Sequence, residues 1–389
     1  MTKSKGPWPT VTLGSIATIQ SGGTPDRANP QYWEGGTIPW VTTSEVNYST
    51  ITQTSECITS DGLANSSAKM FPLGTILMAL YGQGKTRGQV GALGIAAATN
   101  QACAAIMPDD RLDVDYLYQF LKGSYSSIRA LSNTGGQQNL SSQLISEIRV
   151  PLPRRKEQAR IAAILQTWDE AIKNLLLLSK LREKQYLGLR GHLIDWSKNQ
   201  RAVKEFLKPV SRPVPKPTSG YRALSIRSHG KGTFERYVEN PESVEMDTLY
   251  VVKPGDIIVN ITFAWEGAVA LVPRDHDGCL VSHRFPTFIP EPERVDARYL
   301  RHALRMARFT YLLGIVSPGG AGRNRVLSKS DFLDLKVPLL PLDQQGRIAM
   351  ILDDAEKAIT AEERYLSALN RQKRGLMQKL LTGEWRVKL

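Results

Sequence analysis

Apolar residues recur at alternating steps of four and three positions along two long stretches of the chain. Between positions 161 and 193, eight of ten such positions are apolar, and the ten positions that lie 187 residues later also hold eight apolar residues. This spacing places the apolar side chains on one helix face and is typical of a coiled-coil seam. Because neither helix can bury its seam alone, we predict that the two helices pack on each other, antiparallel. The first seam consists of Ile161, Leu165, Trp168, Ile172, Leu175, Ser179, Arg182, Tyr186, Leu189 and Leu193.

The two seams belong to a repeat that extends over the whole chain. The segment 140–153 matches the segment 327–340 at an offset of 187 without a gap, and Gln158 falls on Gln345 at the same offset. Upstream the match is weaker, because insertions shift the offset, but Asp115-Tyr116-Leu117 still resembles Arg298-Tyr299-Leu300. The chain therefore reads as two copies of one unit, each a variable globular part followed by a long helix.

The globular parts are expected to be mixed α and β, which gives an α+β fold with a pseudo-twofold repeat. Short β-rich runs, such as 38–41 and 256–260, are punctuated by Gly and Pro, and each copy is expected to hold one helix, at 115–122 and 297–308. A Pro-rich segment, 209–217, is predicted to be an exposed connection. We expect four regions: globular domain 1–150, long helix 151–198, globular domain 199–338 and long helix 339–389.

The C-terminal segment is similar in sequence to a segment near the N-terminus. Trp385-Arg-Val-Lys-Leu389 resembles Trp8-Pro-Thr-Val-Thr-Leu13. If the helices are antiparallel, the second helix returns the chain to the first globular domain.

Charge points to a polyanionic partner. The chain has 50 Lys and Arg against 37 Asp and Glu, a net charge of +13, with a pI near 9.6. Such an excess suits nucleic acid, although it can also serve solubility alone. No stretch reads as a transmembrane or signal segment, and the three cysteines are far apart, so we expect a cytoplasmic protein with buried thiols and no membrane partner.

The stretch Tyr81-Gly-Gln-Gly-Lys-Thr86 nearly matches the phosphate-binding pattern GxxxxGK[ST]. That pattern requires Gly at position 79, where this chain has Ala79, and a helix after Thr86, where the sequence is turn-rich and β-like. We interpret this stretch as a Gly-rich loop after a strand. A nucleotide-dependent enzyme would require ATP binding at Lys85.

The order and duplication of several motifs resemble the specificity subunit of type I restriction–modification systems. The motifs are Leu13-Gly-Ser-Ile-Ala-Thr-Ile-Gln-Ser-Gly-Gly-Thr-Pro25, Ile38-Pro-Trp-Val41, Gly135-Gly-Gln-Gln-Asn-Leu140, Val150-Pro-Leu-Pro153, Glu157-Gln-Ala-Arg-Ile-Ala162 and Gly375-Leu-Met-Gln-Lys-Leu-Leu381. The second half departs most, because Ala321-Gly-Arg-Asn324 stands where the first half has Gln-Gln-Asn.

The resemblance implies a chain that performs no chemistry. Two target recognition domains would each read one half of a bipartite, asymmetric sequence in double-stranded DNA, and the helices would dock two methyltransferase subunits. S-adenosylmethionine would belong to that partner, which methylates adenine. ATP and Mg would belong to restriction/translocase subunits that join through the methyltransferase, so no cofactor or metal is expected here. An adenine methyltransferase would itself need an Asn/Asp-Pro-Pro-aromatic loop, and this sequence has none.

Candidate DNA contacts are polar or basic residues in loops near Gly, where Lys and Arg suit phosphate and Gln or Arg can pair with a base edge. For each candidate, the alternative interpretation is a solvated surface without DNA contact. This alternative also applies to the four arginines at helical spacing, which would form one stripe: Arg298, Arg301, Arg305 and Arg308. The candidates are Thr42, Thr43, Ser44, Asn47, Tyr81, Gln83, Lys85, Thr86, Arg87, Asn133, Gln137, Gln138, Asn139, Arg227, His229, Lys231, Arg236, Arg298, Arg301, Arg305, Arg323, Asn324 and Arg325.

The main alternative function is a non-enzymatic coiled-coil scaffold whose globular domains bind protein or RNA. Sequence-specific, salt-dependent binding to duplex DNA would separate the two functions.

Overall fold

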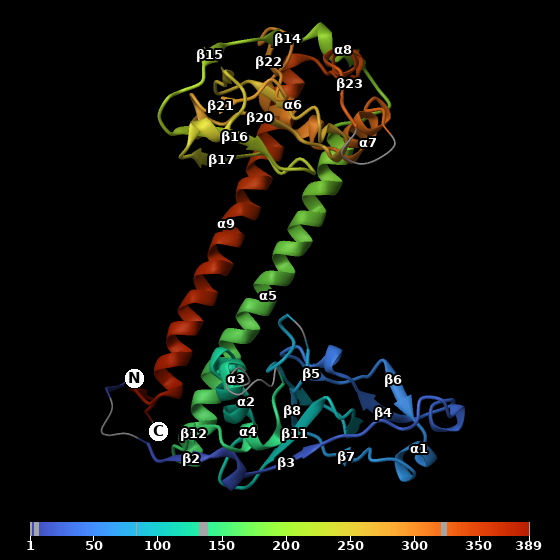
Figure 1. Cartoon of the computed structure of the whole chain (residues 1–389), viewed down its shortest axis with the longest axis vertical. Coiled ribbons are helices and arrows are strands. Elements are labelled where there is room, and N and C mark those ends of the chain that lie inside the picture. Colours follow the sequence, from blue (N-terminus) through green and yellow to red (C-terminus); the bar gives the residue numbers. More distant parts are fainter. Residues whose placement is uncertain (1, 4–7, 83, 132–138, 320–324, 389) are drawn as a thin grey trace. The chain divides into compact units, whose positions relative to one another are not determined.

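The computed structural model describes residues 2–3, 8–82, 84–131, 139–319 and 325–388. The chain packs as two compact units (Figure 1). Unit 1 comprises residues 1–176 and 365–389, and unit 2 comprises residues 177–364. Each unit therefore holds one globular domain together with part of each long helix.

The two long helices are α5 (Arg155–Leu193) and α9 (Leu342–Leu381), of 39 and 40 residues. In unit 1, Asp169 of α5 pairs with Lys373 of α9 at 2.6 Å, and in unit 2 Arg182 pairs with Glu362 at 2.9 Å. A later residue of α5 meets an earlier residue of α9, so the helices are antiparallel, which confirms the prediction. Most seam positions are buried or half-buried, whereas Arg182 is exposed beside its partner.

The globular domain of unit 1 contains two sheets. The first sheet has the strand order β3 (Ala17–Ser21), β11 (Cys103–Pro108), β8 (Ile76–Ala79), β9 (Val90–Leu93) and β5 (Thr50–Ile51). The second has the order β6 (Glu56–Ile58), β4 (Ile38–Val41), β10 (Ala97–Thr99) and β7 (Met70–Phe71). The helices are α1 (Ser60–Ala64), α2 (Val114–Gly123), α3 (Tyr125–Leu131) and α4 (Ser142–Ser146), and β2 (Thr10–Thr12) pairs with β12 (Arg149–Pro151).

The globular domain of unit 2 is built in the same way. One sheet has the order β14 (Leu207–Val210), β22 (Thr287–Pro290), β19 (Ile257–Val259) and β20 (Val269–Leu271). The other has the order β15 (Pro213–Pro215), β18 (Thr248–Val251), β21 (Leu280–Val281), β16 (Tyr221–Ile226) and β17 (Thr233–Val238). The helices are α6 (Ala297–Leu304), α7 (Ala307–Ile315) and α8 (Lys329–Asp334), and β13 (Gln200–Ala202) pairs with β23 (Lys336–Pro338).

The sheets show that the repeat continues through the globular parts. The order β14-β22-β19-β20 repeats β3-β11-β8-β9, and β17-β16-β21-β18 repeats β6-β4-β10-β7. The central pairs β4–β10 and β16–β21 are both parallel, and their other neighbours are antiparallel. The mixed α/β architecture with an internal repeat is confirmed.

The same hydrogen bonds join each globular domain to its long helix. Tyr116 donates to the carbonyl of Pro151 at 2.9 Å, and Tyr299 donates to that of Pro338 at 3.1 Å. Gln158, fully buried, accepts from the Asp113 N–H at 2.6 Å and donates to two carbonyls. The donated bonds reach Arg111 and Pro153, and Gln345 makes the equivalent three bonds to Asp296, Arg294 and Leu340.

The C-terminal segment returns to the first domain, as predicted. Strand β1 (Thr2–Lys3) pairs with β24 (Trp385–Arg386). Met377 and Leu380 of α9 lie in the same apolar core as Trp8 and Leu13.

The expectation of one helix per globular part is wrong. The span 297–308 is divided, because α6 ends at Leu304 and Met306 is extended before α7 begins. Arg308 therefore lies on a different helix from Arg298 and Arg301, and the four arginines do not form one helical stripe.

The Pro-rich segment supplies β14 and β15 at sheet edges, where proline is tolerated. Within the described residues, no helix is long and apolar enough to span a membrane.

Candidate nucleic-acid interface

Two loops occupy equivalent places in both globular domains and carry most of the candidate residues. Loop A follows β4 in unit 1 (residues 42–49) and β16 in unit 2 (residues 227–232). Loop B follows β8 in unit 1 (residues 80–89) and β19 in unit 2 (residues 260–268). Loop A carries candidate residues in both units, whereas loop B carries them in unit 1 only.

Loop A of unit 1 begins as a short 3-10 turn. The Glu45 carboxylate accepts from the Thr42 backbone N–H at 2.7 Å and from the Thr42 hydroxyl at 3.1 Å. Ser44 and Asn47 are exposed beyond this turn, and Thr43 is half-buried. Tyr48 then donates its N–H to the carbonyl of Val90 at 2.8 Å, which ties loop A to the strand that follows loop B.

Loop B of unit 1 rests on α3. The Tyr125 hydroxyl donates to the carbonyl of Lys85 at 2.6 Å, and Arg129 donates to the carbonyl of Gly84. Lys85 and Tyr81 are exposed, whereas Arg87 is half-buried and its Nε has no hydrogen-bond partner among the described residues. Strand β9 follows the loop, so the helix that a phosphate-binding P-loop requires is absent here.

The segment that precedes α4 reaches the same place. Leu140 donates its N–H to the carbonyl of Leu80 at the base of loop B at 3.1 Å, and the adjacent Asn139 is exposed. Tyr48 and Tyr125 meet edge to face at 6.1 Å between ring centroids. Loop A and loop B therefore both contact α3, and Asn139 lies next to the residue that bonds to the base of loop B. The candidates outside the described residues are Gln83, Asn133, Gln137, Gln138, Arg323 and Asn324.

In unit 2, loop A is fixed directly to loop B. His229 donates its N–H to the carbonyl of Glu266 at 2.7 Å, and Gly230 donates to that of Gly267 at 3.1 Å. His229 has a φ of 62°, which a non-glycine residue rarely adopts. Arg227 donates to the carbonyl of Thr233 at 3.1 Å, and Lys231 is exposed without an ion pair to any described residue.

Loop B of unit 2 carries aromatic residues that the sequence motifs hardly singled out. Arg325 lies over the Trp265 ring at 5.5 Å, and the Trp265 Nε1 is buried without a hydrogen-bond partner in the described part of the chain. Phe263 is exposed, as is Tyr311 on α7. The alignment of residues 260–268 with residues 80–89 was the signal that could have found them.

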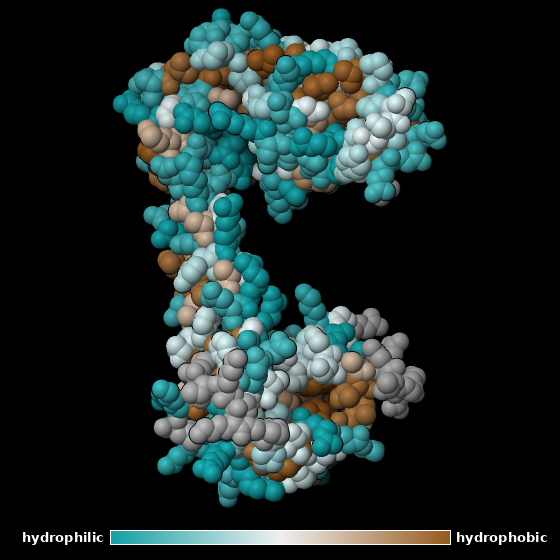
Figure 2. Space-filling view, turned by 90° about the vertical axis from the view of Figure 1, so that its left-hand side faces the viewer, coloured by the Kyte–Doolittle hydropathy of each residue, from teal (hydrophilic) through white to brown (hydrophobic). Residues whose placement is uncertain are grey.

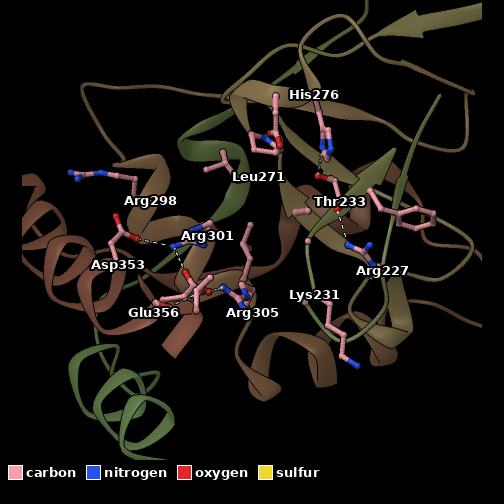
Figure 3. Close-up of a pocket in the computed structure, with 18 of the residues that line it drawn as sticks. Arg227, Lys231, Thr233, Leu271, His276, Arg298, Arg301, Arg305, Asp353 and Glu356 are labelled. Atoms are coloured by element: carbon pink, nitrogen blue, oxygen red, sulfur yellow. Dashed lines mark hydrogen bonds and ion pairs between the residues drawn. The ribbon is translucent and has the colours of Figure 1, made fainter. Parts of the chain in front are cut away.

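A cavity of about 1030 Å³ lies within unit 2 beside loop A (Figure 3). Its walls come from loop A, β20, α6 and α9. In Figure 3 the Lys231 side chain points away from the ion-paired side chains of α6 and α9. Two cations of α9, Lys357 and Arg364, also line the cavity and were not among the candidates. Lys357 pairs with Asp354 at 2.9 Å, whereas Arg364 forms no ion pair with a described residue.

Three predicted DNA contacts form ion pairs within unit 2. Arg298 pairs with Asp296 at 2.7 Å. Arg301 pairs with Asp353 at 2.7 Å and with Glu356 at 2.6 Å, and Arg305 pairs with Glu356 (Figure 3). These contacts join α6 to α9, so they give Arg301 and Arg305 a structural role. Arg236, on β17, is exposed but does not line this cavity.

His302, Asp353 and Glu356 are the one cluster of possible metal ligands in the described chain, with ligand atoms within 4.8 Å of one another. Both carboxylates already bind arginines, and Asp353 also contacts the His302 Nε2 at 2.9 Å. Burial and the charge of Arg301 lower the pKa of His302 to about 4. The cluster is therefore explained as an ion-paired network.

The long helices expose an apolar surface. In unit 2, Leu178, Leu181, Tyr186 and Leu189 of α5 line a groove of about 440 Å³ with two alanines of α9, Ala355 and Ala358. Leu181 is 56% exposed. Figure 2 shows apolar side chains among polar ones along the helices.

The family model for the type I restriction modification DNA specificity domain matches residues 5–182 and 235–371. The EcoR124I/EcoR124II specificity subunit of Escherichia coli is 29% identical over 194 residues, which cover 48% of each chain. The MjaIX specificity subunit of Methanocaldococcus jannaschii is 29% identical over 220 residues, 54% of this chain and 49% of the relative. The chain thus spans about half the length of these relatives.

Two solved structures have the same fold. The S subunit of a type I restriction–modification system from M. genitalium aligns over 96% of both chains with a TM-score of 0.56 and 16% identity. A chain from a study of assembly and conformational transition of the type I system aligns over 99% of this chain and 100% of its own, with a TM-score of 0.59 and 15% identity. Given the family match to both halves, this chain belongs to the type I restriction modification DNA specificity family.

Proposed function

We propose that the chain is the DNA-binding specificity subunit of a type I restriction–modification complex. Its two globular domains each read one half of a bipartite, asymmetric duplex sequence. Its helices dock two adenine methyltransferase subunits, and restriction subunits join through these. The chain itself carries out no reaction, and S-adenosylmethionine, ATP and Mg act in the partners.

One observation carries this proposal. Candidate residues from both halves of the sequence fall on loop A, which occupies an equivalent place in the two domains, and a further set falls on loop B of unit 1. Loop B contacts the equivalent helices α3 and α7. The loops differ in chemistry, with hydroxyls and an amide in loop A of unit 1 against Arg227, His229 and Lys231 in unit 2. Equivalent placement with different side chains suits two domains that read two different half-sites.

The side chains available in these loops match the chemistry of DNA. Lys85 and Lys231 are exposed cations suited to phosphate, and Arg227 has the fork geometry that pairs with guanine. The buried Arg87 Nε and Trp265 Nε1 are donors without a described partner, one in each loop B. A buried donor without an acceptor is costly, so both favour a ligand that supplies acceptors.

The helical surface supports docking of a repeated partner. The groove residues Leu178, Leu181 and Gln185 of α5 correspond, 187 positions later, to Tyr365, Ala368 and Gln372 of α9. Two related surfaces on one chain favour binding of two copies of one protein. Exposed apolar residues such as Leu181 and Tyr365 are the kind that an interface buries.

Reconstitution with the methyltransferase subunit tests the proposal. The complex is incubated with genomic DNA and S-adenosylmethionine, and methylated adenines are mapped by sequencing. We expect one split motif, two short specified blocks around a gap of fixed length. A complex that assembles but methylates no defined motif would favour the scaffold function, in which the globular domains bind protein or RNA.

A further inference from the structure

In each unit, a half-buried carboxylate on a long helix binds cationic or polar side chains of the globular domain. In unit 1 it is Asp169 of α5, which is bound by two residues one turn apart on α2. The Gln119 Nε2 donates at 2.9 Å and the Lys122 Nζ at 2.8 Å. Lys373 of α9, only 6% exposed, reaches the same carboxylate at 2.6 Å. Three helices therefore meet at one acidic group.

The corresponding group of unit 2 is Glu356 of α9, 187 positions after Asp169. Arg301 of α6 and Arg305, directly after α6, both bind it. In the globular parts the two copies are related by an offset of 183, as Tyr116 is to Tyr299, and at this offset Arg305 corresponds to Lys122. The same offset relates Gln119 to His302, whose Nδ1 lies 3.0 Å from the Tyr186 hydroxyl. Tyr186 of α5 corresponds in turn to Lys373, so the other long helix completes both clusters.

Both carboxylates are held in the charged form. Burial raises the pKa of Asp169, but the bonds from Lys122, Lys373 and Gln119 outweigh it and leave the pKa below its usual value. Burial also raises the pKa of Glu356, but the bonds and charges of Arg305 and Arg301 outweigh it and leave the pKa below its usual value. Such ion pairs add little net stability, because the cost of removing the charges from water offsets much of their attraction.

We infer that these two clusters, centred on Asp169 and Glu356, are positioning devices that set the orientation of each recognition domain on the helix pair. The surrounding contacts are apolar and include Leu165 and Leu380 in unit 1, and Ala303 and Leu352 in unit 2. Apolar contacts are non-directional and tolerate small rotations, whereas the hydrogen-bonded ion pairs that Asp169 and Glu356 accept are directional. The inference rests on the proposed function, because the orientation of both domains would determine the gap between the half-sites.

An all-apolar version of the unit 1 cluster tests this inference. The variant combines Gln119→Met, Lys122→Met, Asp169→Leu and Lys373→Met, since buried ion pairs are often replaced by apolar residues without loss of stability. The control is Lys204→Met with Asp334→Leu, which removes an exposed ion pair of unit 2. Each protein, assembled with the methyltransferase, is given a DNA library in which the gap between the two blocks varies by single base pairs.

We expect the wild type and the control to prefer one gap length by about tenfold or more over its neighbours. The all-apolar variant should retain methylation but lose most of that preference. If it folds, methylates and keeps the wild-type preference, the inference is wrong. If it does not fold, Lys122→Met alone should lower the preference, by about threefold on the same scale.

A second readout does not depend on DNA. Spin labels on two exposed residues of unit 1, Lys69 in the globular domain and Arg160 on α5, report their distance distribution in a Cys57→Ser background. The all-apolar variant should broaden this distribution, and the control should not. An unchanged width of the distance distribution would overturn the inference. This readout does not depend on methylation, so absence of a methylation motif in the wild type would refute the proposed function separately.

Discussion

Gln158 and Gln345 show how one residue type at a repeated position holds a domain to a helix. Each is fully buried and makes three hydrogen bonds to backbone groups, and the bonds of Gln345 repeat those of Gln158. The amide both accepts and donates, which an apolar side chain of the same size cannot do. The repeat in the sequence identified the pair but not all of its partners, because two of the three partners of each glutamine lie about 45 to 50 positions away in the variable part.

Substitution of either glutamine by leucine should destabilise the chain. Gln345→Leu leaves the Asp296 N–H and two carbonyls without partners, which costs about 3 kcal/mol in the free energy of unfolding. Urea denaturation measures this change. Gln372→Leu, at an exposed position of α9, is the matched control and should change the free energy by less than about 0.5 kcal/mol. Equal effects at both positions would contradict the hydrogen-bond account.

The free cations of the unit 2 cavity should contribute to DNA affinity through phosphate. Lys231→Ala with Arg364→Ala, in the assembled complex, should lower the slope of log affinity against log salt by about 1.8, because each phosphate contact contributes about 0.9. Fluorescence anisotropy with a duplex that carries the target measures the slope. Lys336→Ala, an exposed cation on β23, should leave it unchanged. A slope that does not change in the double variant would exclude this cavity from the DNA path.

The roles of individual side chains were the hardest property to predict from the sequence. Spacing alone placed Arg301 and Arg305 on a DNA-facing stripe, but it could not show that Asp353 and Glu356, about 50 positions later, would pair with them. Lys231, by contrast, is exposed as a loop residue beside glycines should be. A cation is available to a ligand only if no acid reaches it in the fold, and long-range pairing is not visible in local sequence.

At the scale of elements, the long helices were predictable because their seams repeat over many turns. The short elements of the globular domains were less so. Their helices have only five to ten residues, and the break between α6 and α7 depends on the extended backbone of Met306. Strands of two to six residues carry too little periodicity to fix their pairing, so the equivalence of β4 and β16 became visible only in the sheets.

The helical groove of unit 2 should dock one methyltransferase subunit. Leu181→Asp places a charge on the exposed groove wall, so it should leave folding intact and prevent burial of that surface. Native mass spectrometry should then show one bound methyltransferase subunit in place of two.

Leu187→Asp supplies the matched control. Leu187 is 49% exposed on the same helix but does not line the groove. Its complex should keep both partner subunits. Retention of two partners by Leu181→Asp would show that docking uses another surface.

At the scale of the whole molecule, the repeat determined most of what could be predicted. The duplication and the two long helices followed from the offset of 187. The return of the C-terminal segment to the first domain followed from the likeness of residues 385–389 to residues 8–13 and from the antiparallel helices. The proposed DNA contacts did not follow from the offset, because they fall on loops A and B, where the two copies differ most. The placement of these loop side chains depends on segments far along the chain, such as Val90 for Tyr48 and Glu266 for His229.

An exchange of one globular domain tests the central claim most directly. Residues 199–338 are replaced by the corresponding domain of a family member that directs methylation to a different motif, and methylated adenines are mapped with the same methyltransferase. The account predicts that one block of the split motif changes while the other stays as in the wild type. A change in both blocks, or in neither, would contradict the claim that each domain reads its own half-site.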